Sequence, residues 1–139
     1  MLVLDTNHFS EFERGSGRGA ALRARLRESP REKSLAIATI EEGLRGWLAE
    51  INRHHDLDRQ IIPYAKLKRY VELAANWTIL GWDAESAQMF RQFRAQGVRI
   101  GTMDLKIACI TLAHEATLLT RNARDFNQVP GLRFENWLD

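Results

Sequence analysis

The chain has 139 residues, of which 45% are hydrophobic and 27% are charged, and its formal net charge is +2. These values are ordinary for a soluble globular protein, and we expect residues 1–139 to form a single domain. No apolar stretch reaches the length of a membrane-spanning helix, and the N-terminus lacks the basic and apolar pattern of a secretory signal. The sequence therefore predicts a cytoplasmic protein that does not bind membranes.

The first half of the chain alternates short apolar runs with helical patterns. The run at Leu2–Leu4 predicts a buried parallel strand, and the sequence SLAIAT at Ser34–Thr39 predicts a second one, with short helical segments between them. From Glu41 onward, apolar residues recur with a helical period and predict a long helix. A further helix is expected over about Leu57–Ala75, and the two helices should form a hairpin that projects from the sheet.

The second half continues the alternation of strands and helices. Trp77–Trp82 contains a third strand candidate, and Asp83 is expected to cap the helix that follows it. Residues 102–115 are apolar nearly all round, which predicts a buried helix. A fourth strand is expected at 116–120 and an edge strand or terminal segment at 132–137. This order predicts an α/β fold, a three-layer α/β/α sandwich with a mostly parallel central sheet.

Four acidic residues fall where such a fold places its ligand site. Asp5 ends the first strand, and Glu42 lies in the first turn of the helix after the second strand. Asp104 lies in the first turn of the buried helix, and Asp125 lies in the loop after the fourth strand. Because open α/β sheets bind ligands at the carboxyl ends of their strands, we expect these side chains to converge. Each acid taken alone has an alternative role as a helix cap, so the coincidence of all four indicates the site.

Four ionised carboxylates at one edge repel each other, and a divalent cation removes that repulsion. Oxygen ligands without histidine or cysteine favour Mg²⁺ or Mn²⁺. Such a site suits the hydrolysis of a phosphodiester, because the ion activates water and neutralises charge on the phosphate. The histidines have no paired spacing that indicates zinc, and the single cysteine, Cys109, has the surroundings of a buried apolar residue.

The sequence also contains four blocks in a characteristic order, LDTNHFSE, TIEEGLRGWL, IGTMDLKIA and LLTRNARDFNQVPGLRFENW. In this order and at these separations they resemble the PIN-domain family, and within it the VapC-type toxins of bacterial toxin–antitoxin pairs. The resemblance runs over nearly the whole chain. It implies a PIN-like α/β/α fold and a Mg²⁺- or Mn²⁺-dependent endoribonuclease, the toxin of a type II toxin–antitoxin pair.

The resemblance also assigns roles to individual residues. Asp5, Glu42 and Asp104 match the acids of the first three blocks and are expected to be catalytic. Some relatives carry the fourth acid at the position of Asn122 and others at Asp125, and we assign it to Asp125. Asp5, Asp104 and Asp125 are the expected metal ligands. Polar neighbours expected to support them are Thr6, Asn7, Thr120 and Asn122.

The partners implied by the resemblance are RNA as substrate, a small antitoxin and a second copy of the chain, with DNA bound only through the antitoxin. Two other functions stay open. In one, the acidic pocket holds Mg²⁺ and RNA without cleavage and the protein acts as a regulator with its antitoxin. In the other, Asp5 is the nucleophile of a phosphatase, although Asn7 stands where haloacid-dehalogenase-like enzymes carry a second acid.

Overall fold

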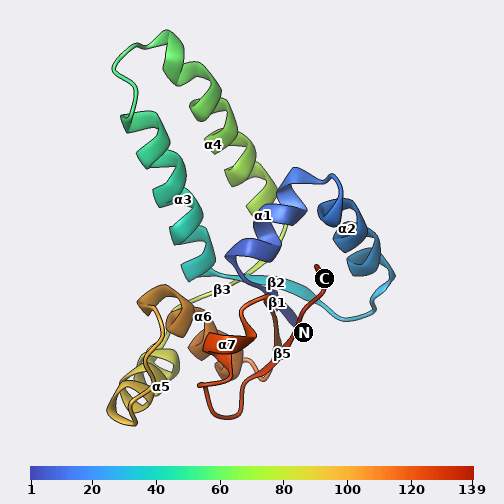
Figure 1. The fold of residues 1–139 in the computed structure, drawn as a ribbon, viewed down its shortest axis with the longest axis vertical. Helices are drawn as coiled ribbons and strands as arrows, with labels where there is room; N and C mark the ends of the chain where they lie inside the picture. Colours follow the sequence, from blue (N-terminus) through green and yellow to red (C-terminus); the bar gives the residue numbers. More distant parts are fainter.

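A computed structural model describes residues 1–139, and its centre is a five-stranded sheet (Figure 1). The strands lie in the order β3-β2-β1-β4-β5, and each neighbouring pair is parallel. Their bounds are β1 (Leu2–Leu4), β2 (Lys33–Ala36), β3 (Thr78–Leu80), β4 (Thr117–Leu119) and β5 (Arg133–Glu135). The order places β1 in the middle, so its carboxyl end lies at the centre of the sheet edge.

Helices cover both faces of this sheet (Figure 1). They are α1 (Thr6–Arg14), α2 (Arg18–Glu28), α3 (Ile37–Asn52), the 3-10 turn η1 (Asp58–Gln60), α4 (Ile61–Ala74), α5 (Ala84–Ala95), α6 (Thr102–Ala113) and α7 (Ala123–Phe126). One core cluster joins the sheet to α1, α2 and α4, and a second joins it to α5 and α6. Leu2 and Leu4 belong to the first cluster and Val3 to the second, as the alternation of a strand requires. The predicted three-layer α/β/α fold with a parallel sheet is confirmed.

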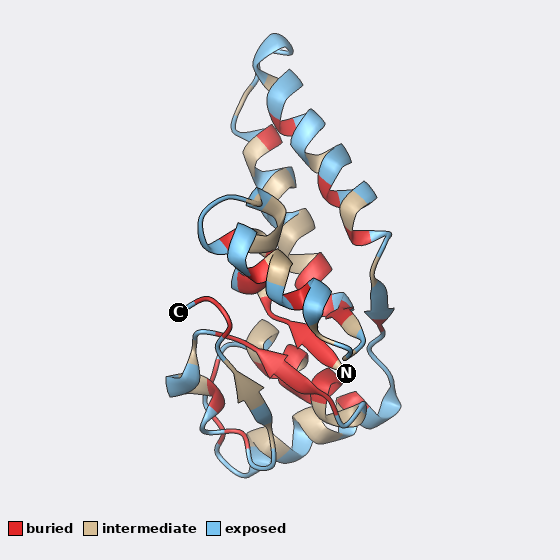
Figure 2. Cartoon of the chain, turned by 90° about the vertical axis from the view of Figure 1, so that its right-hand side faces the viewer, coloured by how far each residue is buried: buried red, intermediate tan, exposed pale blue.

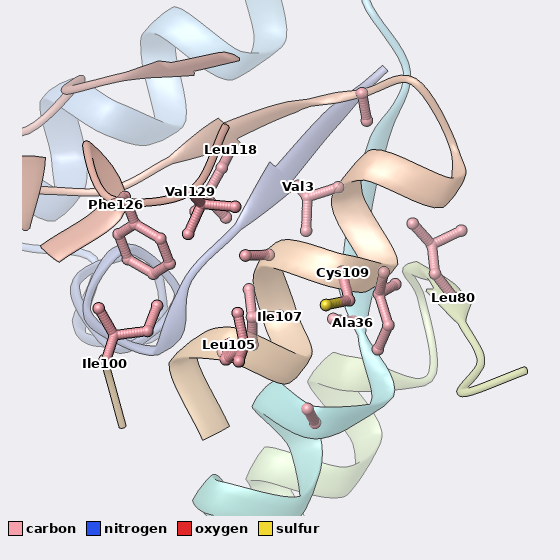
Figure 3. Packing of buried hydrophobic residues seen from close by; sticks show 14 of the residues in the cluster. Val3, Ala36, Leu80, Ile100, Leu105, Ile107, Cys109, Leu118, Phe126 and Val129 are labelled. Carbon is pink, nitrogen blue, oxygen red and sulfur yellow. The ribbon is translucent and has the colours of Figure 1, made fainter. Parts of the chain in front are cut away.

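The predicted buried helix is α6, which lies within the core on one face of the sheet (Figure 3). Its residues Leu105, Ile107, Cys109 and Ile110 have no exposed surface. Burial raises the pKa of the Cys109 thiol to about 11. The thiol is therefore protonated and serves as a small apolar group, as its sequence context predicts.

The predicted helical hairpin is formed by α3 and α4, which extend well beyond the sheet (Figures 1 and 2). Near the sheet the two helices approach closely, because a Cβ at Gly43 would lie 2.1 Å from the Tyr70 hydroxyl oxygen. Toward the far end the side chains are exposed, and Leu57, Ile61 and Ile62 keep 62–78% of their surface. None of the helices is both long and apolar enough to cross a membrane.

Two element boundaries differ from the predictions. The second strand ends at Ala36 and the long helix begins at Ile37, because a buried first turn of helix has the same apolar sequence as a buried strand. Glu42 therefore lies in the second turn of α3, not in the first. The loop predicted around Asp125 is the short helix α7, which is capped by the side chain of Asn122.

Candidate active site

Asp5 lies at the carboxyl end of β1 and is the N-cap of α1. Its side chain accepts a hydrogen bond of 2.8 Å from the backbone N–H of His8, as an acid at this position of a helix commonly does. Its own backbone N–H donates to the Leu119 carbonyl at 3.0 Å, which ties it to the end of β4. Asp5 is only 7% exposed, so its carboxylate is held in a fixed place at the centre of the sheet edge.

Glu42 reaches the same edge from α3. Its carboxylate accepts a hydrogen bond of 2.6 Å from the Thr6 hydroxyl, the residue that follows Asp5. The bond joins α1 to α3 across 36 positions of sequence. The Thr6 hydroxyl therefore holds the carboxylate of Glu42.

Asp104 lies in the first turn of α6 and accepts no hydrogen bond from the protein. Burial, and after it the negative charges of Glu42, Asp5 and Asp125, together raise the pKa of its carboxyl to about 6. Each predicted acid thus acts on this one group, which indicates that the four side chains share one region. No positive charge of the chain lowers the pKa of Asp104.

Asp125 lies in α7 and is positioned by residues that precede this helix. The Asn122 amide donates a hydrogen bond of 2.9 Å to one oxygen of Asp125, and the backbone N–H of Asn122 donates to the Thr120 hydroxyl at 3.0 Å. Asn122 and Thr120 thus lie where they can support Asp125. Asn7 differs, because its side chain is exposed and makes no hydrogen bond within the protein.

The donor set at this edge fits a hard, hydrated cation. Its groups are carboxylate oxygens, the ligands that Mg²⁺ and Mn²⁺ prefer. No three histidine, cysteine, aspartate or glutamate side chains lie close enough to enclose an ion directly. A Mg²⁺ ion commonly keeps several waters and takes only one or two carboxylates, so an open arrangement of acids suits it better than it suits zinc or calcium.

A cleft of about 420 Å³ opens beside Glu42 between α1, α3 and α4. Glu13 and Glu50 add negative charge to its wall, and Trp47 and Lys66 face each other across part of it, with the ammonium 5.7 Å from the ring centre. The cleft therefore adjoins the candidate site at Thr6 and Glu42.

Sequence analysis missed His8, which appeared unrelated to any site because it has no histidine partner. Its side chain is fully buried, and Nδ1 lies 3.2 Å from Oδ1 of Asp5. The available signal was its distance of three residues from Asp5, which places both on one side of a helix start. The histidine thus lies directly against a candidate site residue.

The chain thus has a parallel sheet covered by helices, with acidic side chains near the carboxyl end of its central strands. This is the arrangement that the sequence resemblance implies. The sequence matches the family model described as the PIN domain over residues 2–132. The chain belongs to the PIN-domain family.

Two curated proteins are similar to part of the chain. Ribonuclease VapC2 of Rickettsia felis is 41% identical over 63 residues, which cover 42% of this chain and 47% of that protein. The tRNA(fMet)-specific endonuclease VapC of Salmonella typhimurium is 26% identical over 84 residues, which cover 58% of this chain and 64% of that protein. The chain thus spans about half to two thirds of the length of these relatives.

Solved structures share the fold over nearly the whole chain. VapBC of Salmonella typhimurium bound to DNA superposes with a TM-score of 0.76 at 23% identity, covering 98% of this chain and 97% of that chain. VapBC2 of Rickettsia felis bound to a promoter DNA fragment gives 0.74 at 21% identity, with 98% of both chains covered. A toxin–antitoxin complex of Klebsiella pneumoniae gives 0.68 at 21% identity, with 95% of both covered.

Proposed function

We propose that this protein is a metal-dependent endoribonuclease, the toxin of a type II toxin–antitoxin pair, and that it hydrolyses RNA phosphodiester bonds with Mg²⁺ or Mn²⁺. The observation that carries the proposal is the acidic cluster without an internal cation, in which burial and three neighbouring carboxylates raise the pKa of Asp104 to about 6. Membership of the PIN-domain family and the ribonuclease and endonuclease names of the curated relatives support it.

In this proposal Asp5, Asp104 and Asp125 hold the hydrated cation, in part through its waters, and Glu42 is the fourth catalytic acid. When bound, the ion supplies a Lewis acid that activates water and offsets the charge of the scissile phosphate. The Thr6 hydroxyl holds Glu42 in place by its 2.6 Å hydrogen bond. The Asn122 amide occupies one oxygen of Asp125 and leaves the other free for the ion. Ligands held in this way lose little freedom when the cation binds.

The partners we propose are a small antitoxin and a second copy of the chain, with DNA bound only through the antitoxin. The related VapBC complexes with DNA and the related toxin–antitoxin complex support the antitoxin and its DNA. Two surfaces of the chain also support a protein partner. Leu57, Ile61 and Ile62 are apolar and exposed on the hairpin. The cleft beside Glu42 carries the acids Glu13 and Glu50, a charge that favours a basic segment of a protein partner over bare RNA.

Purified protein incubated with cellular RNA and Mn²⁺ tests the proposal, with Asp104→Asn as the inactivating change. The matched control is Asp83→Asn, since Asp83 is also an acid at a helix start but caps α5 through its 2.8 Å bond from the Ser86 backbone N–H. Asparagine caps a helix as well as aspartate does. We expect the control to cleave RNA like the parent and Asp104→Asn to lose cleavage.

The outcomes separate the proposed enzyme from the alternatives. Equal cleavage by Asp104→Asn and the parent would show that the carboxylate mechanism is wrong. A parent that binds Mn²⁺ and RNA but leaves the RNA intact would favour the regulator. Cleavage that persists in EDTA would exclude the metal from the reaction.

A further inference from the structure

His8 is a fully buried histidine one turn after Asp5, on the side of α1 that faces the core. Both of its ring nitrogens have partners. Nε2 accepts a hydrogen bond of 3.2 Å from the backbone N–H of Trp137, and Nδ1 lies 3.2 Å from Oδ1 of Asp5. The imidazole thus connects the segment that follows β5 to the acid at the end of β1.

The tautomer of His8 follows from these contacts. A backbone N–H can only donate, so Nε2 must carry a lone pair and no proton. In the neutral imidazole the proton is then on Nδ1, where it points at Asp5. The contact between Nδ1 and Asp5 is therefore a hydrogen bond that the histidine donates.

The two oxygens of Asp5 consequently have different surroundings. Oδ1 accepts two hydrogen bonds from His8, one from its backbone N–H at 2.8 Å and one from Nδ1 at 3.2 Å. Helix capping by itself accounts only for the first. Oδ2 accepts no hydrogen bond from the protein and is the oxygen left for an outside ligand.

The segment that donates to Nε2 is firmly anchored. The side chains of Trp137 and Leu138 are 7–9% exposed. The Trp137 indole N–H donates to Glu135 at 2.7 Å, and the Arg25 guanidinium lies 4.0 Å from the centre of a Trp137 ring. Its backbone N–H is therefore fixed, and with it the tautomer of His8.

We propose that His8 is a positioning residue of the site, which orients Asp5 so that Oδ2 is presented to the metal ion. This inference rests on the ribonuclease proposed above. Outer hydrogen bonds of this kind typically change metal affinity or activity by about 10- to 100-fold when they are removed. A histidine that merely fills the core would affect stability and leave the affinity for Mn²⁺ unchanged.

Three substitutions separate the two roles. His8→Leu removes both hydrogen bonds of the ring, and His8→Asn keeps an amide N–H close to the position of Nδ1. Phe9→Leu is the control for packing, because Phe9 is the next residue, is 1% exposed and packs against Tyr70 and Trp77 away from Asp5. We measure Mn²⁺ binding by calorimetry on the full chain without RNA, and RNA cleavage separately.

We expect His8→Leu to bind Mn²⁺ about 10- to 100-fold more weakly than the parent and His8→Asn to recover most of that loss. Phe9→Leu should unfold at lower urea concentration but bind Mn²⁺ like the parent. If His8→Leu binds Mn²⁺ like the parent, the positioning role of His8 is wrong. RNA cleavage by the parent would in that case still support the proposed ribonuclease. A parent that neither binds Mn²⁺ nor cleaves RNA would overturn both.

The tautomer gives a second test, which needs no variant to fold. In the ¹⁵N spectrum of the parent's histidines, we expect the His8 signals of a ring protonated on Nδ1 and unprotonated on Nε2. A His8 ring protonated on Nε2 would overturn the proposal, because Nδ1 would then have no proton to donate to Asp5.

Discussion

Two groups of acidic side chains lie on this molecule, and they differ in what surrounds them. In the segment that includes β5 and the residues after it, Glu135 accepts hydrogen bonds from the Trp137 indole and from Arg31, and Asp139 accepts them from Asn136 and Arg121. These bonds lower the pKa of both carboxyls. At the carboxyl edge of the sheet, burial and neighbouring acids raise the pKa of Asp104 to about 6.

The comparison teaches which acids the fold itself accounts for. The charges of Glu135 and Asp139 are matched by arginines of the same chain, so these residues stabilise the structure and need nothing from outside. The acids around Asp104 have no such partner, and their crowding costs free energy in the absence of a ligand. Perturbed groups of the second kind are typical of functional sites.

The largest expected effect is the loss of RNA cleavage when an acid near Asp104 is changed. Asp5→Asn removes a charged ligand, yet asparagine still caps α1 and still accepts the bonds from His8, so the fold should persist. We expect cleavage to fall at least about 100-fold. Asp139→Asn is the same change at an acid that is paired with an arginine, and it should retain activity within about twofold. Cleavage assays under one set of conditions compare them, and similar losses in both variants would remove the distinction between the groups.

The next effect is on the stability of the folded protein, which Asp104→Asn should increase. The folded pKa of Asp104 is raised, so the folded state holds the proton more tightly and loses stability as the pH rises from about 3.8 toward about 6. Allowing for partial exposure, Asp104→Asn should stabilise the metal-free protein by about 1–2 kcal/mol at pH 7. The gain should be much smaller at pH 4. Urea unfolding in EDTA at both pH values measures it, and a destabilised variant at pH 7 would contradict the crowding of charges.

A smaller effect is expected at Asp125, one of whose oxygens already accepts a hydrogen bond from Asn122. Asp125→Asn should raise the Mn²⁺ concentration for half-maximal cleavage roughly tenfold while the rate at saturating Mn²⁺ stays near that of the parent. Titration of cleavage with Mn²⁺ gives both quantities. A complete loss of activity would place Asp125 on the same level as Asp5.

The smallest effect is expected on the free energy of unfolding when Glu135, which is paired with Arg31, is changed. Because the pKa of Glu135 is lowered in the folded state, its contribution to stability is present above its ordinary value of 4.5 and is lost as the pH falls through the folded value. The Glu135 side chain is 42% exposed and screened by solvent, so Glu135→Gln should cost only about 0.5 kcal/mol at pH 7. Urea unfolding of parent and variant over this pH range checks the direction, and a cost that grew on acidification would contradict it.

Much of the fold could be predicted because short apolar runs and helical periods carry the signal. The run at Ile37–Thr39 misled the prediction, since the first turn of α3 is buried and reads like a strand. The helix α7 was missed because it is only four residues long and depends on the Asn122 side chain that caps it. That residues 1–139 form a single domain stays a prediction.

The proximity of the four acids could be predicted because strand ends in a parallel sheet share one edge; their roles as site residues stay a prediction. The spacing of His8 from Asp5 was a signal that we missed, but the orientation of its ring could not be predicted, because the donor to Nε2 is a backbone N–H 129 positions away. Nor does the sequence reveal that Asn7 is exposed while Thr6, its neighbour, holds Glu42. These roles depend on side-chain directions that only the folded chain fixes.

The most direct test of a metal site among the acids around Asp104 is a crystal structure of the full chain with MnCl₂, in which anomalous scattering locates the ion. We expect a manganese peak at the carboxyl edge of the sheet, within bonding distance of oxygens from Asp5 and Asp104. No peak there at saturating Mn²⁺, or a peak only at other surface acids, would contradict a metal site at this edge.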